Sequence, residues 1–310
     1  MRAKSIASDL RQYFDHSGVV YARVHSIFQD VINIMDQHGE LITLISDRKE
    51  MTPMSLQVDF TKMPCRRLVS DDEVVLDAGA LKIPRIGFVL RYEQSSVWNP
   101  ELNLEGLLPI NETFIRTAEQ VHEVLMRFGD RASILPLIKI VDRRYAVPWQ
   151  DKSLEFEGNT YTDFIEDILL EILDHLAKNR YDEVAGLIHR FIGFGPGLTP
   201  STDDFLMGLE MTLYTYEQIV LDGDQVKQFV KLVAEEAAGK TTAVSEAMLK
   251  NAARGRIALT HGIMLREIFK RDSNQVQTIA NDVLKHGATS GTDFLFGLYC
   301  AQVLLIRNKR

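Results

Sequence analysis

The order of hydrophobic and polar positions divides the chain into a strand-like first part and a helical second part. Runs rich in β-branched residues, with partial alternation of apolar and polar positions, span 18–36, 39–46, 73–79 and 83–92. Gly, Pro and Asp separate these runs, as is typical of the turns between short strands. The pattern therefore predicts a compact β-sheet or β-barrel in the N-terminal part.

A helix is predicted from Asn111, which can cap it, to about Phe128, with Gly129 as the stop. Its apolar residues recur at helical spacing: Phe114, Ile115, Ala118, Val121, Leu125 and Met126. The next apolar run, ILPLIKIV at 134–141, is short and continuous and is predicted as one more strand.

Beyond the polar stretch QDKSLEFEGNT the apolar period becomes helical, and nearly all of the chain after Tyr161 is predicted as helix. We therefore expect a domain boundary near residue 155. The predicted fold class is α+β, with a β-rich domain over 1–155 and an all-α domain over 156–310.

Within the helical part, a nine-residue pattern at 201–209 returns at 290–298. Six of the nine positions are identical, because Ser201, Asp204, Phe205, Leu206, Gly208 and Leu209 correspond to Ser290, Asp293, Phe294, Leu295, Gly297 and Leu298. The repeat predicts two equivalent helices related by pseudo-symmetry, whose N-termini could converge on one pocket. The alternative is purely structural: capped helices whose glycines allow close approach.

The first copy follows a loop with three glycines, Gly193, Gly195 and Gly197. Thr199 is the natural N-cap and Pro200 suits the first helical position, where no amide hydrogen is needed. Loop amides that point to a helix N-terminus bind anions, so phosphate or carboxylate is the expected ligand class.

Two acids near the start of the same helix complicate an anion site, because a bare phosphate would repel Asp203 and Asp204. Either a cation such as Mg²⁺ lies between the acids and the anion, or the acids face away and serve the helix dipole and the first-turn amides.

A third helix start follows at 239–242, GKTT. It is not a nucleotide-binding loop, because Ala234 occupies the position of the first glycine and a helix precedes it where a strand is required. Thr241 or Thr242 can cap the new helix. If this N-terminus joins the other two, the hydroxyls of Thr241, Thr242 and Ser245 could bind an anion, with Arg254 supplying charge. The alternative is simple capping and a solvated basic helix end.

Other candidate residues have ordinary interpretations as well. His261 and His286 each precede a glycine and could transfer protons, but C-capping or surface positions are common for such histidines. Arg143 and Arg144 could face an interdomain cleft or could simply be solvated.

Composition narrows the function classes. A chain of 310 residues with net charge -8 and an isoelectric point near 5.5 does not match a binder of nucleic-acid backbones, which needs a concentrated basic face. Two cysteines, Cys65 and Cys300, form neither a disulfide scaffold nor a zinc motif. Because no signal peptide and no run of 18 apolar residues are found, we expect a soluble, cytoplasmic protein that does not bind membranes.

Three segments together carry a resemblance to a known family: GFGPGLTPSTDDFLMGL, TTAVSEAMLKNAARG and GATSGTDFLFGL. They resemble a bacterial family, once of unknown function, that includes the AllH-type subunit of oxamate carbamoyltransferase from anaerobic allantoin breakdown, a purine-catabolic route of nitrogen metabolism. The family often has glycine where this chain has Thr202. The resemblance implies a cytoplasmic enzyme component that works with partner subunits and converts oxalurate and phosphate to oxamate and carbamoyl phosphate. It assigns no catalytic residue.

Carbamoyl transfer between an amide and phosphate develops charge on oxygen atoms, which fixed amides and hydroxyls stabilise. We expect Gly195, Gly197 and Thr199 to hold the phosphate or carboxylate, with Ser201 and Ser290 donating hydrogen bonds and Gly291 and Thr292 completing the second N-terminus. Asp203, Asp204 and Asp293 would hold a metal or orient a nucleophile. The rival hypothesis is a noncatalytic regulatory or assembly subunit.

Overall fold

The computed structural model describes residues 1–149, 157–221 and 224–309. The chain forms two compact units. The first, here the β-rich unit, comprises Met1–Glu101 with the returning segment Arg256–Leu259. The second, here the helical unit, comprises Leu102–Gly255 with Thr260–Arg310. The predicted α+β class, with the β-rich part first, is confirmed.

The division between the units falls at residue 101 and not near residue 155. The predicted boundary lies within residues 150–156, which are outside the described part of the chain. The difference arises because the helix that follows Asn111 already belongs to the helical unit. A polar stretch is therefore a weaker sign of a boundary than the change from strand to helical period.

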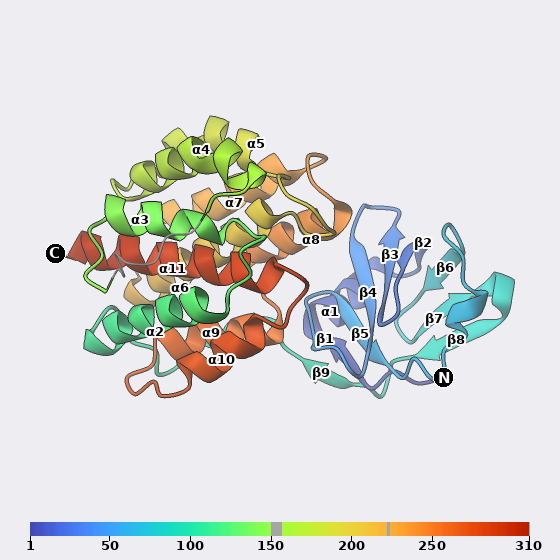
Figure 1. Cartoon of the computed structure of the whole chain (residues 1–310). Coiled ribbons are helices and arrows are strands. Elements are labelled where there is room, and N and C mark those ends of the chain that lie inside the picture. Colours follow the sequence, from blue (N-terminus) through green and yellow to red (C-terminus); the bar gives the residue numbers. More distant parts are fainter. Residues whose placement is uncertain (150–156, 222–223, 310) are drawn as a thin grey trace. The chain divides into compact units, whose positions relative to one another are not determined.

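The β-rich unit is built on one nine-stranded sheet with the order β8-β7-β6-β2-β3-β4-β5-β1-β9 (Figure 1). The strands are β1 (Ser5–Ala7), β2 (Val20–Ile27), β3 (Val31–Asp36), β4 (Leu41–Ser46), β5 (Ser55–Val58), β6 (Glu73–Leu76), β7 (Ala80–Ile83), β8 (Phe88–Arg91) and β9 (Ser96–Trp98). The first residues reach back to β8, because the Ala3 amide donates to the Arg91 carbonyl at 2.8 Å. The sheet consequently curls into a half-barrel.

Alternation along the strands builds the core of this unit. In β2 the side chains of Val20, Ala22 and Val24 are buried, while Tyr21 and Arg23 face outward. A helix that the sequence pattern did not reveal, α1 (Ser8–Ser17), lies against this core. Leu10 and Phe14, one turn apart, are its buried apolar residues, and the Phe14 ring stacks on Tyr92 with 5.1 Å between ring centroids.

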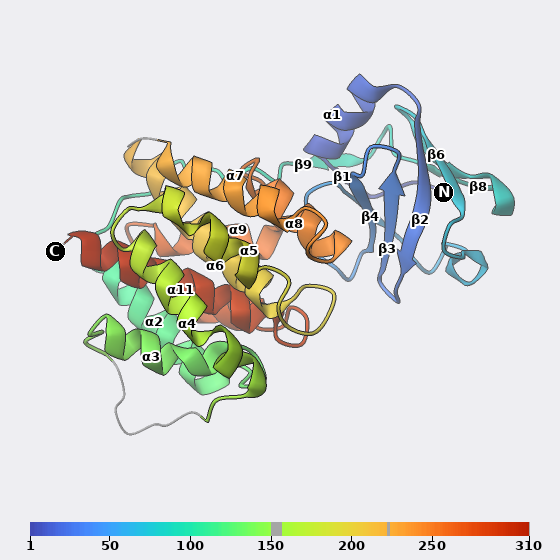
Figure 2. The ribbon, with the colours of Figure 1, turned by 90° about the horizontal axis from the view of Figure 1, so that it is seen from above.

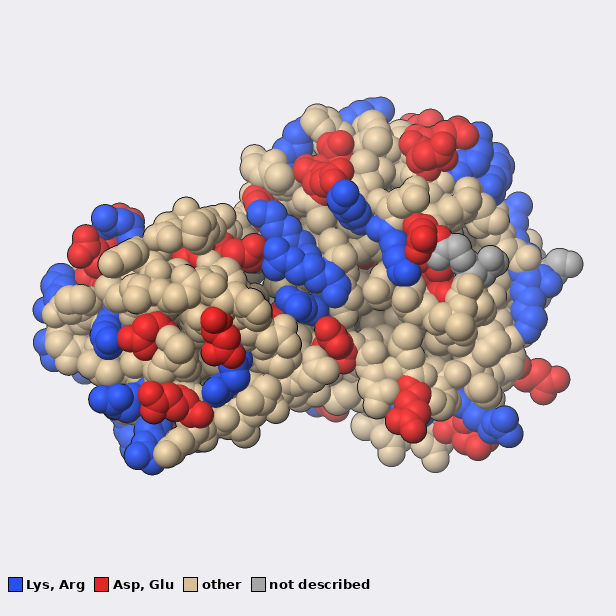
Figure 3. Space-filling model, turned by 180° about the vertical axis from the view of Figure 1, so that it is seen from behind, with Lys and Arg blue, Asp and Glu red and all other residues tan. Residues whose placement is uncertain are grey.

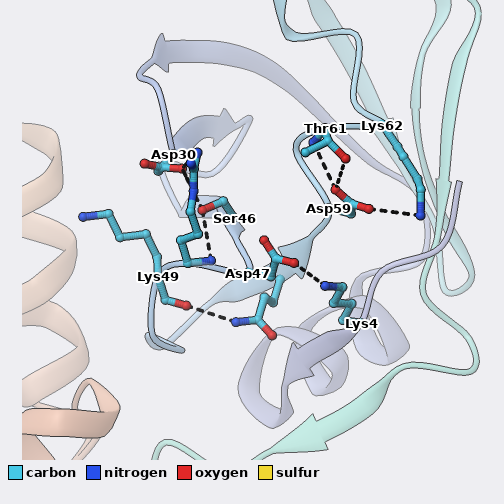
Figure 4. A network of polar contacts seen from close by, with 10 residues as sticks. Lys4, Asp30, Ser46, Asp47, Lys49, Asp59, Thr61 and Lys62 are labelled. Carbon is cyan, nitrogen blue, oxygen red and sulfur yellow. Dashed lines mark hydrogen bonds and ion pairs between the residues drawn. The ribbon is translucent and has the colours of Figure 1, made fainter.

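Polar contacts fasten the loops of the β-rich unit (Figure 4). The Asp30 carboxylate accepts from the Ser46 hydroxyl at 2.8 Å and from Arg48. Asp59 accepts from Thr61 and pairs with Lys62 at 3.0 Å, which together lower the pKa of Asp59 to about 2. These ion pairs are exposed, so their contribution to stability is small.

The helical unit contains α2 (Glu112–Phe128), α3 (Ile138–Arg144), α4 (Thr160–Leu176), α5 (Ala185–Phe191), α6 (Ser201–Val220), α7 (Gln225–Ala237), α8 (Ala243–Ala252), α9 (Leu259–Ile268), α10 (Val276–Val283) and α11 (Ser290–Lys309). Two long helices, α6 and α11, lie at its centre, with the other helices around them (Figure 2). The predicted cap and stop of α2 are confirmed, because the Asn111 side chain accepts from the Phe114 amide and Gly129 follows the last turn.

The strand predicted at 134–141 is wrong. The segment forms a short 3₁₀-helix, η3 (Leu135–Leu137), which continues into α3. The Ser133 hydroxyl accepts from the Leu135 amide at 3.0 Å and starts the turn, where Pro136 needs no amide hydrogen. Because η3 and the start of α3 are almost entirely buried, the run has no alternation that could separate strand from helix.

Glycines at equivalent positions of the repeat allow α6 and α11 to pack closely. A Cβ atom at Gly208 would lie 2.0 Å from the Phe294 carbonyl oxygen, and one at Gly297 would lie 1.9 Å from the Phe205 carbonyl oxygen. Each glycine meets the carbonyl of the equivalent phenylalanine on the other helix, so the two contacts are related by the pseudo-symmetry of the repeat. The repeat therefore forms a pseudo-symmetric helix pair, as its spacing predicts.

The surface carries charges of both signs. On the face shown in Figure 3, Lys and Arg side chains of the β-rich unit are interleaved with Asp and Glu. Among the described helices, none is both long and apolar enough to cross a membrane.

Candidate active site

The N-termini of α6 and α11 lie side by side in the helical unit. The hydroxyl oxygens of Thr199, just before α6, and Ser290, the first residue of α11, are 2.9 Å apart. The glycine contacts lie about two turns further along both helices, so the helices run in the same direction from this point. The two positive helix ends therefore converge, as the repeat predicts.

The loop before α6 depends on its glycines. Gly193, Gly195 and Gly197 have φ angles of 78°, 123° and 103°, in the region that side chains disfavour. Thr202 fastens the loop, because its hydroxyl accepts from the Phe194 amide at 3.0 Å and its own amide donates to the Phe194 carbonyl at 3.1 Å. A glycine at position 202 could supply only the second of these bonds.

The predicted N-cap is displaced by one residue. The N-cap is Pro200, with φ -55° and ψ 144° and no side-chain cap, and α6 begins at Ser201. The Thr199 hydroxyl contacts Ser290 instead of a first-turn amide. The reason is that the Phe194 and Pro200 carbonyls already accept from first-turn amides.

Asp203 serves the scaffold of the loop. Its carboxylate accepts from the Gly193 amide at 2.7 Å and from the Thr241 hydroxyl. Burial raises the pKa of Asp203, and the hydrogen bond from Thr241 is the largest opposing effect. This side chain therefore faces the inside of the loop, and the amide it binds belongs to the loop and not to the first turn of α6.

The third helix start joins the other two. The Thr242 hydroxyl donates to the Leu198 carbonyl and also accepts from the Ser245 amide at 3.2 Å as the N-cap of α8. The hydroxyls of Thr241 and Thr242 thus bind protein acceptors. Ser245 is buried, and its hydroxyl oxygen has no hydrogen-bond partner in the described part of the protein. Arg254 is exposed just beyond the C-terminal end of α8.

The second copy of the repeat is also anchored to a neighbouring loop. The Thr292 hydroxyl accepts from the Asp130 amide at 3.1 Å. Gly291 packs closely, since a Cβ atom there would lie 2.0 Å from the Val283 carbonyl oxygen. Thr292 occupies the position equivalent to Asp203, so the third residue of each copy fastens a loop.

The fourth residue of each copy, Asp204 and Asp293, is a buried acid at the junction of the helices. Burial raises the pKa of Asp204 well above its usual value, and the neighbouring Asp293 raises it further. Burial raises the pKa of Asp293 to about 7, against the hydrogen bond that its Oδ1 accepts from the Ile134 amide at 3.0 Å. A serine on the opposite helix lowers each pKa in part. The Ser290 hydroxyl lowers the pKa of Asp204, and the Ser201 hydroxyl lowers that of Asp293.

Both acids keep an oxygen available. The Oδ2 atoms of Asp204 and Asp293 have no hydrogen-bond partner in the described part of the chain, although both are buried. The backbone amides of Gly195, Gly197 and Thr199 also donate to no protein acceptor among the described residues. Free amides and free carboxyl oxygens on the segments that meet at one helix junction are suited to bind a small anionic molecule and to exchange a proton with it.

The Mg²⁺ site expected at Asp203 and Asp204 stays a prediction. Asp203 and Asp204 have different surroundings, and Asp203 already accepts protein hydrogen bonds on both carboxylate oxygens. Within 1–149, 157–221 and 224–309, no group of three or more His, Cys, Asp or Glu side chains could hold a metal ion.

The two candidate histidines contact each other, which the sequence did not reveal. The ring centroids of His261 and His286 are 5.2 Å apart, and His261 stacks on Phe294 at 4.0 Å. Burial and the neighbouring His286 lower the pKa of His261 to about 3. His261 is therefore neutral near pH 7, and it lies in the first turn of α9, so it is not a C-cap.

Arg144 forms an ion pair with Asp174.

Glu210 is a buried acid that the sequence analysis did not select. It is completely buried in α6, and neither of its carboxyl oxygens has a partner among the described residues. Burial, and to a lesser extent Asp203, raise the pKa of Glu210 well above its usual value. Glu210 lies seven residues, or about two helical turns, after Asp203, and this spacing could have shown that the two acids share one face of α6.

Comparison with known families covers both units. Residues 191–302 match the model of the oxamate carbamoyltransferase subunit AllH, and residues 2–97 match the AllH family N-terminal domain. No solved structure matches the chain. The β-rich unit, which carries no recognisable motif, thus matches a domain of the same family as the motif-bearing helices.

Proposed function

The chain belongs to the AllH family of oxamate carbamoyltransferase subunits, and from this we propose that it carries a carbamoyl-transfer site at the paired N-termini of α6 and α11. The reaction is the conversion of oxalurate and phosphate to oxamate and carbamoyl phosphate, or a transfer of the same type. The observation that carries the proposal is the buried pair Asp204 and Asp293, each with a free carboxyl oxygen.

The proposed transfer needs one acid that donates a proton and one that accepts a proton. A phosphate oxygen forms a bond to the carbamoyl carbon of oxalurate, and the bond from that carbon to the oxamate nitrogen breaks. Phosphate loses a proton and the leaving nitrogen gains one, so the overall reaction needs no external acid. Asp204 is assigned the donation to the leaving nitrogen, because burial and the neighbouring Asp293 raise its pKa well above the usual value and so favour its protonated form.

Asp293 acts as the base. Its pKa of about 7 leaves a substantial fraction ionised at neutral pH, so its carboxylate accepts the proton from phosphate. Two neighbouring acids in different surroundings are a common basis for dividing acid and base roles. Proton exchange between the two carboxyls restores the starting state.

Anion binding is assigned to the loop and the helix ends. The free amides of Gly195, Gly197 and Thr199 and the hydroxyls of Ser201 and Ser290 would bind oxygens of the phosphate or carboxylate. Two helix dipoles add positive potential at the same point. Such fixed donors also stabilise negative charge that develops on oxygen during transfer.

The direct test uses the assembled enzyme with Asp204→Ala or Thr199→Ala. We expect Asp204→Ala to lower the rate of carbamoyl phosphate formation by about 10²- to 10⁴-fold, because proton transfer is lost. Thr199→Ala should also lower it, because its hydroxyl fixes the junction at Ser290. Exposed Asp282→Ala serves as the control, and circular dichroism checks folding.

Normal turnover with both substitutions would instead favour a noncatalytic regulatory or assembly subunit. One observation suits this rival: Asp203, Thr241, Thr242 and Thr292 all bind protein groups. Phosphate, oxamate and carbamoyl phosphate should each raise the melting temperature of the catalytic subunit with concentration. A regulatory subunit would respond to an unrelated metabolite or to none.

A further inference from the structure

We propose that Tyr161, Phe164 and Phe194, here called the aromatic face, are the docking surface for another subunit of the enzyme. The partner is expected to present an apolar contact surrounded by Lys and Arg side chains. The inference rests on the family being one of enzyme subunits and does not depend on the roles proposed for Asp204 and Asp293.

The aromatic face is exposed although its rings are paired. The Phe164 side chain is 64% exposed and Tyr161 is 37% exposed. The ring of Phe194 stacks on Phe164 with 4.8 Å between centroids and meets the edge of Tyr161 at 5.8 Å. Burial of exposed aromatic side chains against a partner is favourable, because it removes apolar surface from water.

Local structure holds the rings in place before any partner binds. Tyr161 and Phe164 lie three residues apart in the first turns of α4, and a capping box between Asn159 and Thr162 fixes the start of that helix. Phe194 is held by both backbone hydrogen bonds to Thr202. Rigid aromatic side chains lose little conformational entropy on binding, as is common at the energetic centres of interfaces.

Acidic side chains accompany the aromatic face and define the charge of the partner. Asp163, Asp167 and Glu171 are all exposed and follow one another at four-residue spacing along α4. Within the described residues, none of the three forms an ion pair with a Lys, Arg or His side chain. An unneutralised acidic row beside an apolar centre favours a partner with complementary basic side chains.

The aromatic face is also continuous with the glycine loop. Phe194 lies between Gly193 and Gly195, within the segment whose amides are assigned to anion binding. A subunit that covers Phe194 would therefore restrict the motion of that loop. Subunit assembly would then affect anion binding by the loop. Assembly and catalytic activity can still be measured separately.

The test measures the affinity between this chain and the other purified subunits of its enzyme by isothermal titration calorimetry. Phe164→Glu should weaken assembly at least about 100-fold, because it places a charge at the apolar centre. Phe128→Glu is the matched control, since Phe128 is 57% exposed and ends a different helix, α2. Its affinity should equal that of the unaltered chain, and circular dichroism should show both variants folded.

A second variant tests the charge. Asp163→Lys together with Asp167→Lys should weaken assembly and reduce its dependence on salt. Unchanged affinity of Phe164→Glu for the other subunits would overturn the proposal. The proposal would also fail if Phe164→Glu separated two copies of this chain but bound the other subunits normally. Asp204→Asn should assemble normally, so failure of the docking surface and failure of the catalytic proposal give different results.

Discussion

Asp204 and Asp293 occupy the same position of the repeat and have different surroundings. The Asp293 carboxyl accepts a hydrogen bond from the Ile134 amide, which favours its ionised form, and no backbone donor reaches Asp204 in the described chain. The pKa of Asp293 is accordingly about 7, while that of Asp204 is raised well above its usual value. The Ile134 amide is thus one of the contacts that favour the base role proposed for Asp293.

The Asp293 carboxyl should make stability depend on pH. Its pKa rises from 3.8 in the unfolded chain to about 7 in the folded one, so the native state binds more protons between these values. Stability from this group is present below about pH 4 and is lost as the pH rises towards 7. Urea unfolding at several pH values should show this loss in the unaltered chain and a smaller loss in Asp293→Asn. Parallel stability curves would contradict the assignment.

The hydroxyl groups show the limit of residue-level prediction. The repeat correctly pairs Asp204 with Asp293, because identical spacing on equivalent helices places them equivalently. Thr241 and Thr242 have residue types suited to bind either a ligand or the protein, and only the folded chain shows their bonds to Asp203 and Leu198. Sequence can identify a donor but not its acceptor when the two lie about forty residues apart.

At the level of elements, the contact between α6 and α11 is set by two glycines. Any side chain at Gly208 or Gly297 would overlap the backbone of the opposite helix, and the helices would move apart. Because the carboxyl pair lies about one turn before these glycines, the same contact also sets its geometry.

Gly208→Ala should therefore destabilise the helical unit by about 1–3 kcal/mol through overpacking. Gly186→Ala in α5 is the matched control, because a Cβ atom there meets nothing within 4 Å. Alanine is the better helix former, so the control should be stabilised by up to about 1 kcal/mol. Urea unfolding at constant pH measures both, and equal stability of Gly208→Ala and the unaltered chain would refute the close contact.

Long amphipathic elements were predictable and short buried ones were not. The helix of 112–128 and the longer strands, β2, β3 and β4, could be read from their hydrophobic patterns. By contrast, α1 presents few apolar residues to the core, and β1, β5 and β9 have only three or four residues each. Such segments take their structure from their neighbours, so their own pattern carries little information.

Across the whole molecule, the chain passes between its two units more than once. The segment Arg256–Leu259, between α8 and α9, returns to the β-rich unit. There Ile257 donates to the Pro100 carbonyl, and Arg256 lies 3.8 Å from the buried Asp9. The end of α8 and the start of α9 are thus covalently tied to the β-rich unit, which no local sequence pattern indicates. Both units match models of the same family.

The central claim is that the paired helix ends hold the reacting anions. It is tested most directly by a crystal structure of the assembled enzyme with oxamate and phosphate. We expect electron density for an anion that contacts the amides of Gly195, Gly197 and Thr199, with the Oδ2 atom of Asp204 or Asp293 within hydrogen-bonding distance. Clear density for both ligands at another location, with this junction closed by protein side chains, would contradict the claim.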